Sequence, residues 1–468
     1  MSDLHELTAA QQLRSLRAKE ISSRELTGHY LARIDRLDEE LAAFITVTGE
    51  QALEEAGRAD ERLARGEQEA LLGLPIGIKD LAATKGIRTT FGSAALADFV
   101  PGEDAWTVGL LRQAGAVVLG KTNTPEFGST CYTENEVVPR PSVTPYGTDR
   151  YSSGSSGGAA TAVAAGLLPV AHGSDGAGSI RTPAATCHLV GVKPSRGLVS
   201  SAPASSFFVA STEGPIARTV EDAALLLDVM ASPAPGDLYG WSHASSFTAA
   251  LGLRRRLKIA MWTDTGLDQD VDPEAALAVG RMAQKLIDLG HEVREIPLPA
   301  RWDEPTRRAI VDWFAYSVGA AVQAMMLTDR THLLSSYSQQ LLTMSDALSA
   351  SDVVTAQAVL ARYASTFLAA VDDYDVVLTP TTNGAPVRIG YYEGDEAERM
   401  LRWSCHTPWV NLAGVPAVSI PSHVDDDGLP HGVHLVGRNR RDADLLALAA
   451  QLESLAPWDE HHPPCWHR

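Results

Sequence analysis

The chain has 468 residues, 45% of them hydrophobic, which can bury the core of one large α/β domain or of two to three smaller ones. Its formal net charge of −19 argues against a general nucleic-acid or anionic-membrane surface, although a local basic groove stays open. No signal peptide is expected, and no membrane span, because long uninterrupted apolar runs are absent. Four scattered cysteines without a CxxC pair indicate reduced thiols in a cytoplasmic protein.

The first part of the chain changes from helical to alternating character. Residues 3–60 have the apolar spacing of helices. The run LLGLPIGIKD (71–80) then predicts a short apolar strand that reaches Lys79. Residues 104–123 predict a helix, a glycine stop at Gly115 and a buried strand, which is one α/β step.

The rest of the chain continues this alternation after a run of serine and glycine, YSSGSSGGAA (151–160), that composition alone would assign to a linker. We expect a helix and a strand within 159–175, a helix at 220–231, a strand at 255–262, a helix at 273–290 followed by 291–299, helices over 301–370, a strand at 374–380 and a hairpin at 417–437 that turns at Asp427-Gly428. The pattern predicts a single α/β domain over 1–468, with a mixed or mostly parallel central sheet and helices on both faces.

Two glycine loops present a serine. The first, GSSGG (154–158), matches G-x-S-x-G, with Ser156 at the nucleophile position of an α/β-hydrolase elbow. That turn requires a strand directly before it, and the preceding RPSVTPYGTDRYS is broken by prolines, so this esterase alternative is disfavoured. A Ser–His–acid triad could recruit His406, His431 or His434, and nothing in the sequence singles out one of them.

The second loop, GSDGAGSIR (173–181), offers a different arrangement. Its small residues Gly176, Ala177 and Gly178 let successive backbone N–H groups turn inward and form an oxyanion hole just before Ser179. Taken alone, this pattern is more typical of an ordinary glycine turn with a solvated serine.

Three segments read together resemble the amidase signature family: GLPIGIKD with Lys79, GSSGGAA with Ser155, and GSDGAGSIRTPAATCHLVGVKPSRGLVS with Ser179. The segments GKTNTPEFG (120–128), GPIARTVEDAALLLDVM (214–230) and GVHLVGR (432–438) also look like family segments. The resemblance covers about residues 20 to 450 and is strongest over 70–230. It implies an amidase signature fold and an amidase that acts on linear amides without a cofactor or a metal.

The resemblance also implies the roles of individual residues. Ser179 is similar to the family's nucleophile, Ser155 to the bridging serine that the family holds with a cis peptide bond, and Lys79 to the base. The backbone N–H groups of Gly176, Ala177, Gly178 and Ser179 would then hold the oxyanion. Support for the two loops would come from Asp175, Arg181, Gly157 and Gly158, the two glycines by adopting positive φ. The helical region of about 301–370 would face the substrate and set its choice.

These roles agree with the chemistry of the side chains. A lysine acts as a base only when neutral, so work near pH 7 to 8 requires its pKa to fall by about 3 units, which burial in an apolar strand can supply. A serine hydroxyl both donates and accepts, as a proton relay requires. Ala177 and Ser153 stand where the family commonly has glycine, which affects the expected substrate rather than the activity.

Other functions remain open on the same scaffold. The protein could be an acyl or ammonia transferase, such as a glutaminase-like subunit of a tRNA-dependent amidotransferase or an amide-forming biosynthetic enzyme. NTPEFG and TEN (133–135) look more like stand-alone amidases. We expect a small-molecule amide as partner, with neither nucleic acid nor membrane, and a homodimer stays open. Apolar bulk in 312–327 favours an aryl or medium aliphatic acyl chain, and the C-terminal DEHHPPCWHR (459–468) predicts a frayed end rather than a metal site.

Overall fold

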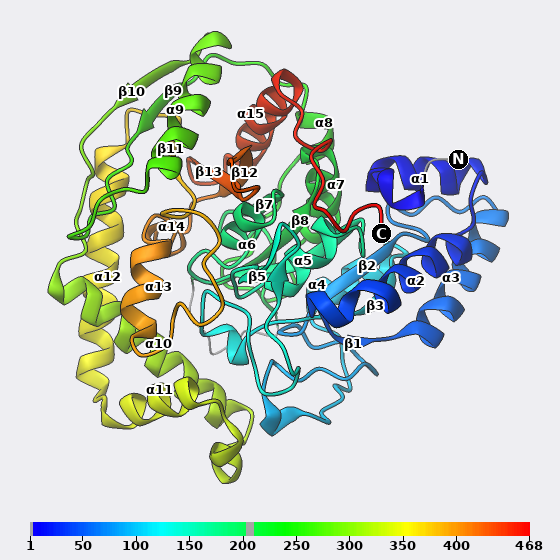
Figure 1. The fold of residues 1–468 in the computed structure, drawn as a ribbon, viewed down its shortest axis with the longest axis horizontal. Coiled ribbons are helices and arrows are strands. Elements are labelled where there is room, and N and C mark those ends of the chain that lie inside the picture. Colours follow the sequence, from blue (N-terminus) through cyan, green and yellow to red (C-terminus); the bar gives the residue numbers. More distant parts are fainter. Residues whose placement is uncertain (1–2, 203–209) are drawn as a thin grey trace.

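The computed structural model of the chain describes residues 3–202 and 210–468 (Figure 1). Its strands are β1 (Phe44–Val47), β2 (Pro75–Lys79), β3 (Val117–Thr122), β4 (Val143–Thr144), β5 (Gly147–Tyr151), β6 (Val170–Asp175), β7 (Val190–Lys193), β8 (Thr212–Ala217), β9 (Lys258–Met261), β10 (Glu292–Glu295), β11 (Val376–Pro380), β12 (Ala417–Val424) and β13 (Pro430–Gly437).

Its α-helices are α1 (Ala9–Ala18), α2 (Ser23–Leu41), α3 (Gly49–Ala64), α4 (Trp106–Gln113), α5 (Gly157–Ala164), α6 (Arg181–Thr186), α7 (Val220–Met230), α8 (Phe247–Ala250), α9 (Pro273–Asp288), α10 (Glu304–Ala324), α11 (Ser336–Ala347), α12 (Ala350–Ala370), α13 (Glu396–Ser404), α14 (Pro408–Ala413) and α15 (Asp442–Leu455). Short 3₁₀ turns lie at Leu4–Glu6, Ala94–Leu96, Glu126–Gly128 and Thr328–Leu333.

One mixed sheet of eleven strands runs through the molecule, in the order β1-β3-β2-β6-β8-β7-β12-β13-β11-β9-β10. β2 is parallel to β3 and β6, and β9 is parallel to β10 and β11, whereas the other neighbours are antiparallel. Strands β4 and β5 pair separately. The predicted single α/β domain with a mixed central sheet is therefore confirmed.

Helices cover both faces of this sheet, as the side chains of one strand show. On β11, Val376 and Leu378 belong to the large core cluster that also contains Leu286 of α9 and Leu448 of α15. Val377 belongs instead to a second cluster, with residues of α10, α12 and α14. Because successive side chains of a strand point to opposite faces, the two clusters lie on opposite sides of the sheet.

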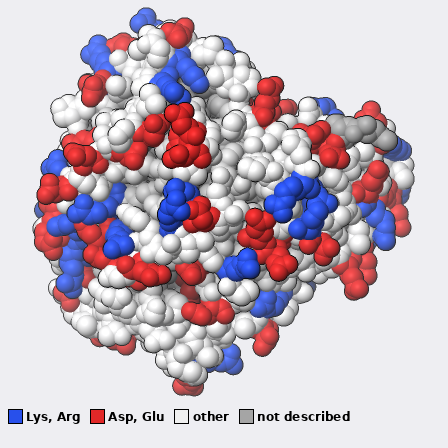
Figure 2. Space-filling model, in the orientation of Figure 1, with Lys and Arg blue, Asp and Glu red and all other residues white. Residues whose placement is uncertain are grey.

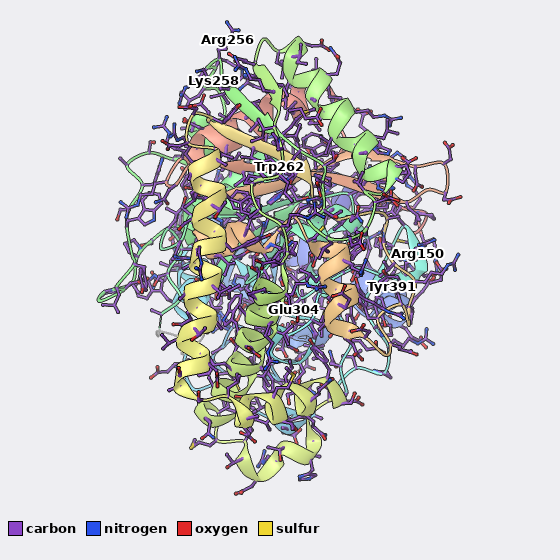
Figure 3. All side chains as sticks on the ribbon, turned by 90° about the vertical axis from the view of Figure 1, so that its left-hand side faces the viewer. Arg150, Arg256, Lys258, Trp262, Glu304 and Tyr391 are labelled. Carbon is purple, nitrogen blue, oxygen red and sulfur yellow. The ribbon has the colours of Figure 1, made fainter. Side chains whose placement is uncertain are left out.

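Helices α10, α11 and α12 form a layer on one side of the molecule, where α10 packs against the other two. Figure 3 shows α12 (yellow) upright on this side, with α10 beside it. Helix α12 is long enough, and has a high enough mean hydropathy, to cross a membrane. The sequence did not suggest this, because α12 contains no long uninterrupted apolar run. A single helix of this kind is weak evidence for a membrane span, because helices that pack in a protein core pass the same test.

The C-terminal segment lies against the N-terminal helices, with the two ends of the chain near one another in Figure 1. Trp466 is fully buried, and its carbonyl oxygen accepts hydrogen bonds from His5 and Arg33. The prediction of a frayed end is therefore wrong: the aromatic side chains of this segment supply apolar surface that docks it, although its prolines and terminal position suggested disorder.

Candidate active site

Three strand ends meet at one edge of the central sheet. β2 and β6 are parallel, so their carboxyl ends lie at the same edge, and β8, antiparallel to β6, begins there. This topology brings together Lys79 at the end of β2, Asp175 at the end of β6 and Glu213 near the start of β8, where Glu213 pairs in register with Ser174. The edge thus collects two carboxylates and a lysine from distant parts of the sequence.

Lys79 is completely buried, and its Nζ lies 2.8 Å from Ser155 Oγ and 3.2 Å from the carbonyl oxygen of Ser174. Burial removes the hydration that an ammonium group needs and lowers the pKa of Lys79 from 10.5 to about 7, although the charges of Asp175 and Glu213 act in the opposite direction. A large fraction of Lys79 is therefore neutral near pH 7, as a base must be.

The serine and glycine run is part of the core and is not a linker, because Ser152, Ser153 and Ser155 are all buried. The peptide bond between Gly154 and Ser155 is cis, as the resemblance implies. Ser153 has φ of 67°, in the left-handed region that glycine favours, which fits its place at a position where glycine is common.

Gly157 and Gly158 support this loop in a way that differs from the expectation. They begin α5 and do not have positive φ, so that part of the prediction is wrong. Close packing explains them instead: a Cβ on Gly157 would lie 2.3 Å from Thr133 Oγ1, and one on Gly158 would lie 2.4 Å from Asn123 N. The sequence cannot reveal this approach, because the neighbours come from distant segments.

Ser156 does not have the environment of a nucleophile. Contrary to expectation, a strand precedes it, since β5 ends at Tyr151, although β5 pairs with β4 outside the central sheet. Ser156 is fully buried, and its hydroxyl donates to the carbonyl oxygen of Ser174 at 3.1 Å and accepts from Ser174 N at 3.3 Å. The hydroxyl is thus occupied in joining two loops, and the esterase alternative loses its support.

The loop that carries Ser179 is held by an ion pair beneath it. Arg181 Nε and Nη2 each lie 2.9 Å from the carboxylate of Asp175, and both residues are buried. Burial alone would raise the pKa of Asp175, but the Arg181 guanidinium holds it well below its usual range. His434, one of the three histidines considered as a triad base, has its Nε2 2.8 Å from Arg181 Nη1 and belongs to this support.

The backbone of the same loop offers donors for an oxyanion. Gly178 N donates to Asp175 Oδ1 at 2.7 Å, so this N–H is already engaged. Within residues 3–202 and 210–468, no acceptor contacts the N–H groups of Gly176, Ala177 and Ser179. Thr407 Oγ1 donates to the carbonyl oxygen of Ala177 at 2.6 Å, which orients the peptide unit between Ala177 and Gly178. Three amides at and beside Ser179 are therefore free to bind an anionic oxygen.

Ser179 is half-buried and borders two cavities, of about 320 Å³ and 80 Å³. Ser155 lines the larger one, and Ser156 N bonds the Ser179 carbonyl oxygen at 3.1 Å, which ties the two serine loops together. Among the bonds of the described residues, none joins the hydroxyls of Ser155 and Ser179. The apolar walls of the larger cavity come mainly from Leu81, Phe91, Phe127, Trp313, Phe314, Val318 and Met325.

Two polar residues of the larger cavity, His172 and Glu213, were not anticipated from the sequence. His172 Nε2 lies 3.2 Å from Glu213 Oε2, and His172 Nδ1 accepts a bond from Lys79 N at 3.3 Å. The only indication of Glu213 in the sequence was its position directly before the GPIAR segment (214–218).

Metal-ligating side chains gather elsewhere in the described part of the chain, at Glu274, His423 and His431. His423 Nε2 lies 2.8 Å from Glu274, and His431 Nε2 lies 2.9 Å from Asp425. Each histidine thus has a carboxylate partner, on the β12–β13 hairpin and α9, and none of these residues lines the two cavities.

Comparisons with known proteins agree on one family. The family model described as Amidase matches residues 25–446. The putative amidase AmiB2 of Mycobacterium tuberculosis is 38% identical and covers 99% of both chains. A glutamyl-tRNA(Gln) amidotransferase subunit of Thioalkalivibrio sulfidiphilus is 37% identical over 98% of this chain and 99% of its own. A bacterial aryl acylamidase of the amidase signature family superimposes with a TM-score of 0.91 at 29% identity, over 100% of both chains.

Proposed function

The chain belongs to the amidase signature family, and we propose that it is an amidase that hydrolyses small carboxylic amides through an acyl-enzyme on Ser179. The observation that carries the proposal is the 2.8 Å contact between Lys79 Nζ and Ser155 Oγ, beside a cavity that Ser179 also borders. This contact supports Lys79 as the base and Ser155 as the hydroxyl relay beside Ser179.

In the proposed reaction, Ser179 Oγ attacks the amide carbonyl. Ser155 takes the proton of Ser179 and passes its own to neutral Lys79. The N–H groups of Gly176, Ala177 and Ser179 stabilise the resulting oxyanion. The relay then returns the proton to the leaving nitrogen, so that an amine or ammonia departs and leaves an ester on Ser179. Water attacks this ester along the same relay and releases the carboxylic acid.

The cavity supports an aryl or medium aliphatic group on the substrate. Phe314 borders both cavities, and Phe91, Phe127 and Trp313 line the larger one. The similar aryl acylamidase structure supports the same class of substrate. The four cysteines, Cys131, Cys187, Cys405 and Cys465, are all free thiols, which supports a reducing, cytoplasmic location.

Three serine variants and one covalent probe test this function. Ser179→Ala is expected to lose amide turnover and labelling by an aryl phosphonate, which mass spectrometry would otherwise locate on the 173–181 loop. Ser155→Ala should reduce turnover by about 10²-fold or more, the scale of losing a positioned proton-transfer group. Ser156→Ala is the matched control and should retain most activity. Unchanged turnover in Ser179→Ala, or phosphonate on Ser156, would refute the mechanism.

A transferase is the second candidate, because a glutamyl-tRNA(Gln) amidotransferase subunit is 37% identical over almost the whole chain. On this alternative the acyl-enzyme or the released ammonia would pass to an acceptor in a complex. Hydroxylamine competition distinguishes the two: a hydrolase forms mainly the free acid, whereas a transferase diverts most of the acyl group to the hydroxamate. Size-exclusion chromatography of the protein from its native host would show whether a partner protein is bound.

A further inference from the structure

We propose that Glu213 makes this active site selective for amides that carry a positive charge in the part of the substrate occupying the larger cavity. The inference rests on the proposed function and adds a substrate class to it. Glu213 lines the same cavity as Ser155 and Ser179, and 19% of its side chain is exposed. The cavity is otherwise walled largely by apolar side chains, so an ionised carboxylate in its wall would dominate the local field.

The neighbouring histidine does not cancel this charge. Backbone N–H groups can only donate, so the contact from Lys79 N requires His172 Nδ1 to carry a lone pair. The ring proton is then on Nε2, which faces Glu213 Oε2 at 3.2 Å. In this tautomer the ring is uncharged. Burial alone would raise the pKa of Glu213, but the charge that His172 carries when it is protonated, together with the neighbouring Thr107 hydroxyl, lowers that pKa below its usual value, so Glu213 is ionised at neutral pH.

No other formal charge compensates Glu213 at the cavity. Among the described residues that line either cavity, Glu213 is the only Asp, Glu, Lys or Arg. Lys79 bonds to Ser155 and Ser174, and it must be neutral to accept a proton. Residues 203–209, outside the described part, have the sequence PASSFFV without any charged side chain. The active form thus keeps one uncompensated negative charge in the cavity wall.

An uncompensated charge in an apolar wall selects its ligand by charge. A substrate ammonium or amidinium group near Glu213 gains an electrostatic partner, and a substrate carboxylate is repelled. The aromatic side chains that line the cavity together with Glu213 favour an apolar spacer between the cation and the scissile carbonyl. The expected substrate class is therefore an amide with a protonated primary amine at the end of a short apolar chain or ring.

Two matched substrate series test this selectivity. In the acyl series, the anilides of 5-aminopentanoic, hexanoic and glutaric acid carry a cation, no charge and an anion. In the amine series, the acetamides of 4-(aminomethyl)aniline, 4-ethylaniline and 4-aminophenylacetic acid likewise carry a cation, no charge and an anion, in that order. In at least one series, kcat/KM of the wild type should fall from cation to neutral by at least about tenfold, the scale of a charge-assisted contact, and again from neutral to anion.

Glu213→Gln keeps an acceptor for His172 and removes the charge. Its cation-to-neutral ratio should approach one, while the neutral amide is still turned over. The substitution also changes the field at Lys79, but that effect acts on all substrates of a series and leaves the ratio unaffected. Glu295→Gln, an exposed carboxylate on the edge strand β10, is the control and should keep the wild-type ratio.

Binding to the Ser179→Ala protein separates this proposal from the proposed function. Titration calorimetry should show the cationic amide binding at least about tenfold more tightly than the neutral one, and Glu213→Gln in the same background should abolish the difference. Equal binding of the three charges in both series, or a preference that survives Glu213→Gln, would overturn the charge proposal. Absence of turnover with every amide, alongside selective binding, would instead refute the hydrolase.

Discussion

Lys79 is fully buried in an apolar strand, and the same burial favours the neutral form that the proposed base requires and lowers the stability of the fold. Because the pKa of Lys79 falls to about 7, its protonated form dominates at acidic pH. With a neutral amide as substrate, we expect kcat/KM to fall about tenfold per pH unit below pH 7 and to level off above it. A pH–rate profile measures this, and a rate that is flat from pH 5 to 9 would exclude Lys79 as the titrating base.

Lys79→Met is expected to abolish activity and stabilise the fold. The pKa of Lys79 is about 7 in the folded state and near 10.5 when unfolded, so the unfolded chain binds more protons between these values. The burial of Lys79 therefore lowers the free energy of unfolding by on the order of 4 kcal/mol at pH 7. This loss shrinks, and the wild type becomes more stable, as the pH increases towards 10.5. Methionine avoids this cost but leaves Ser155 without its partner, so the net gain is smaller.

Urea unfolding of the Lys79→Met variant and the wild type at pH 7 and pH 10 measures the effect. The free energy of unfolding should be higher for the variant at pH 7, with the difference shrinking at pH 10. Lys258→Met, at an exposed position on β9, should show no such dependence on pH. A variant that is less stable at pH 7 would mean that the lysine's hydrogen bonds outweigh its desolvation.

At the scale of elements, the loop between β6 and α6 must fit against the segment that contains Thr407. Gly178 has φ of +136°, and a Cβ there would lie 2.3 Å from Thr407 Oγ1, whereas a Cβ on Gly176 would meet nothing within 4 Å. Gly178→Ala should therefore shift Ser179 and lower kcat by about 10²-fold, the scale of losing one oxyanion donor. Gly176→Ala is the matched control, and an equal loss in both variants would show that steric fit is not the cause.

Helix α10 presents one face to the cavities and another to solvent. Phe314 borders both cavities, and Tyr316 on the same helix is 39% exposed. Phe314→Ala should reduce kcat/KM for an aryl amide by about tenfold relative to acetamide, because the lost apolar contacts serve the larger substrate. Tyr316→Ala should leave that ratio unchanged. A ratio that does not move in Phe314→Ala would place substrate choice outside α10.

The local pattern of the sequence was sufficient to predict the long helices and strands and the residues at strand ends. The strand reaching Lys79 and the hairpin β12–β13 could be predicted because their apolar periodicity is local. Strand β5 was missed, since prolines interrupt its surroundings and its partner β4 has two residues. Glu213 escaped notice because it reaches the site only through the antiparallel pairing of β8 with β6, a non-local contact.

At the scale of the whole molecule, the net charge of −19 is an excess of acidic over basic residues, and basic side chains still gather locally on the surface. Figure 2 shows Lys and Arg lying among Asp and Glu on the face in view. Arginines line two hollows away from the active site, and one of them, Arg255, is paired with Asp375 at 3.0 Å and with Asp444 at 3.1 Å. Figure 3 places Arg256 and Lys258 at the outer end of β9, whereas Trp262 lies in the interior. The charge of Arg255 is thus compensated by two carboxylates.

The molecule is also closed by contacts between its two ends. The indole ring of Trp466 stacks on His462 with centroids 4.0 Å apart, and the guanidinium of Arg218 lies 5.0 Å from the centroid of the indole. The carbonyl oxygen of Trp466 accepts hydrogen bonds from His5 Nε2 at 3.1 Å and from Arg33 Nη2 at 3.0 Å. The C-terminal segment therefore joins helix α2 and the segment before α1 to the loop between β8 and α7.

Trp466→Ala should destabilise the protein without changing the chemistry at Ser179. Removing a fully buried indole leaves a cavity and typically costs about 3 to 5 kcal/mol, whereas the backbone bonds to His5 and Arg33 can persist. Urea unfolding measures the loss, and kcat/KM at 25 °C should stay within about twofold because the site lies on other elements. His467→Ala, at an exposed neighbouring position, is the control and should change stability by less than about 0.5 kcal/mol. If Trp466→Ala costs no more than His467→Ala, the segment is a peripheral appendage; a loss confined to Trp466→Ala makes it part of the cooperative core.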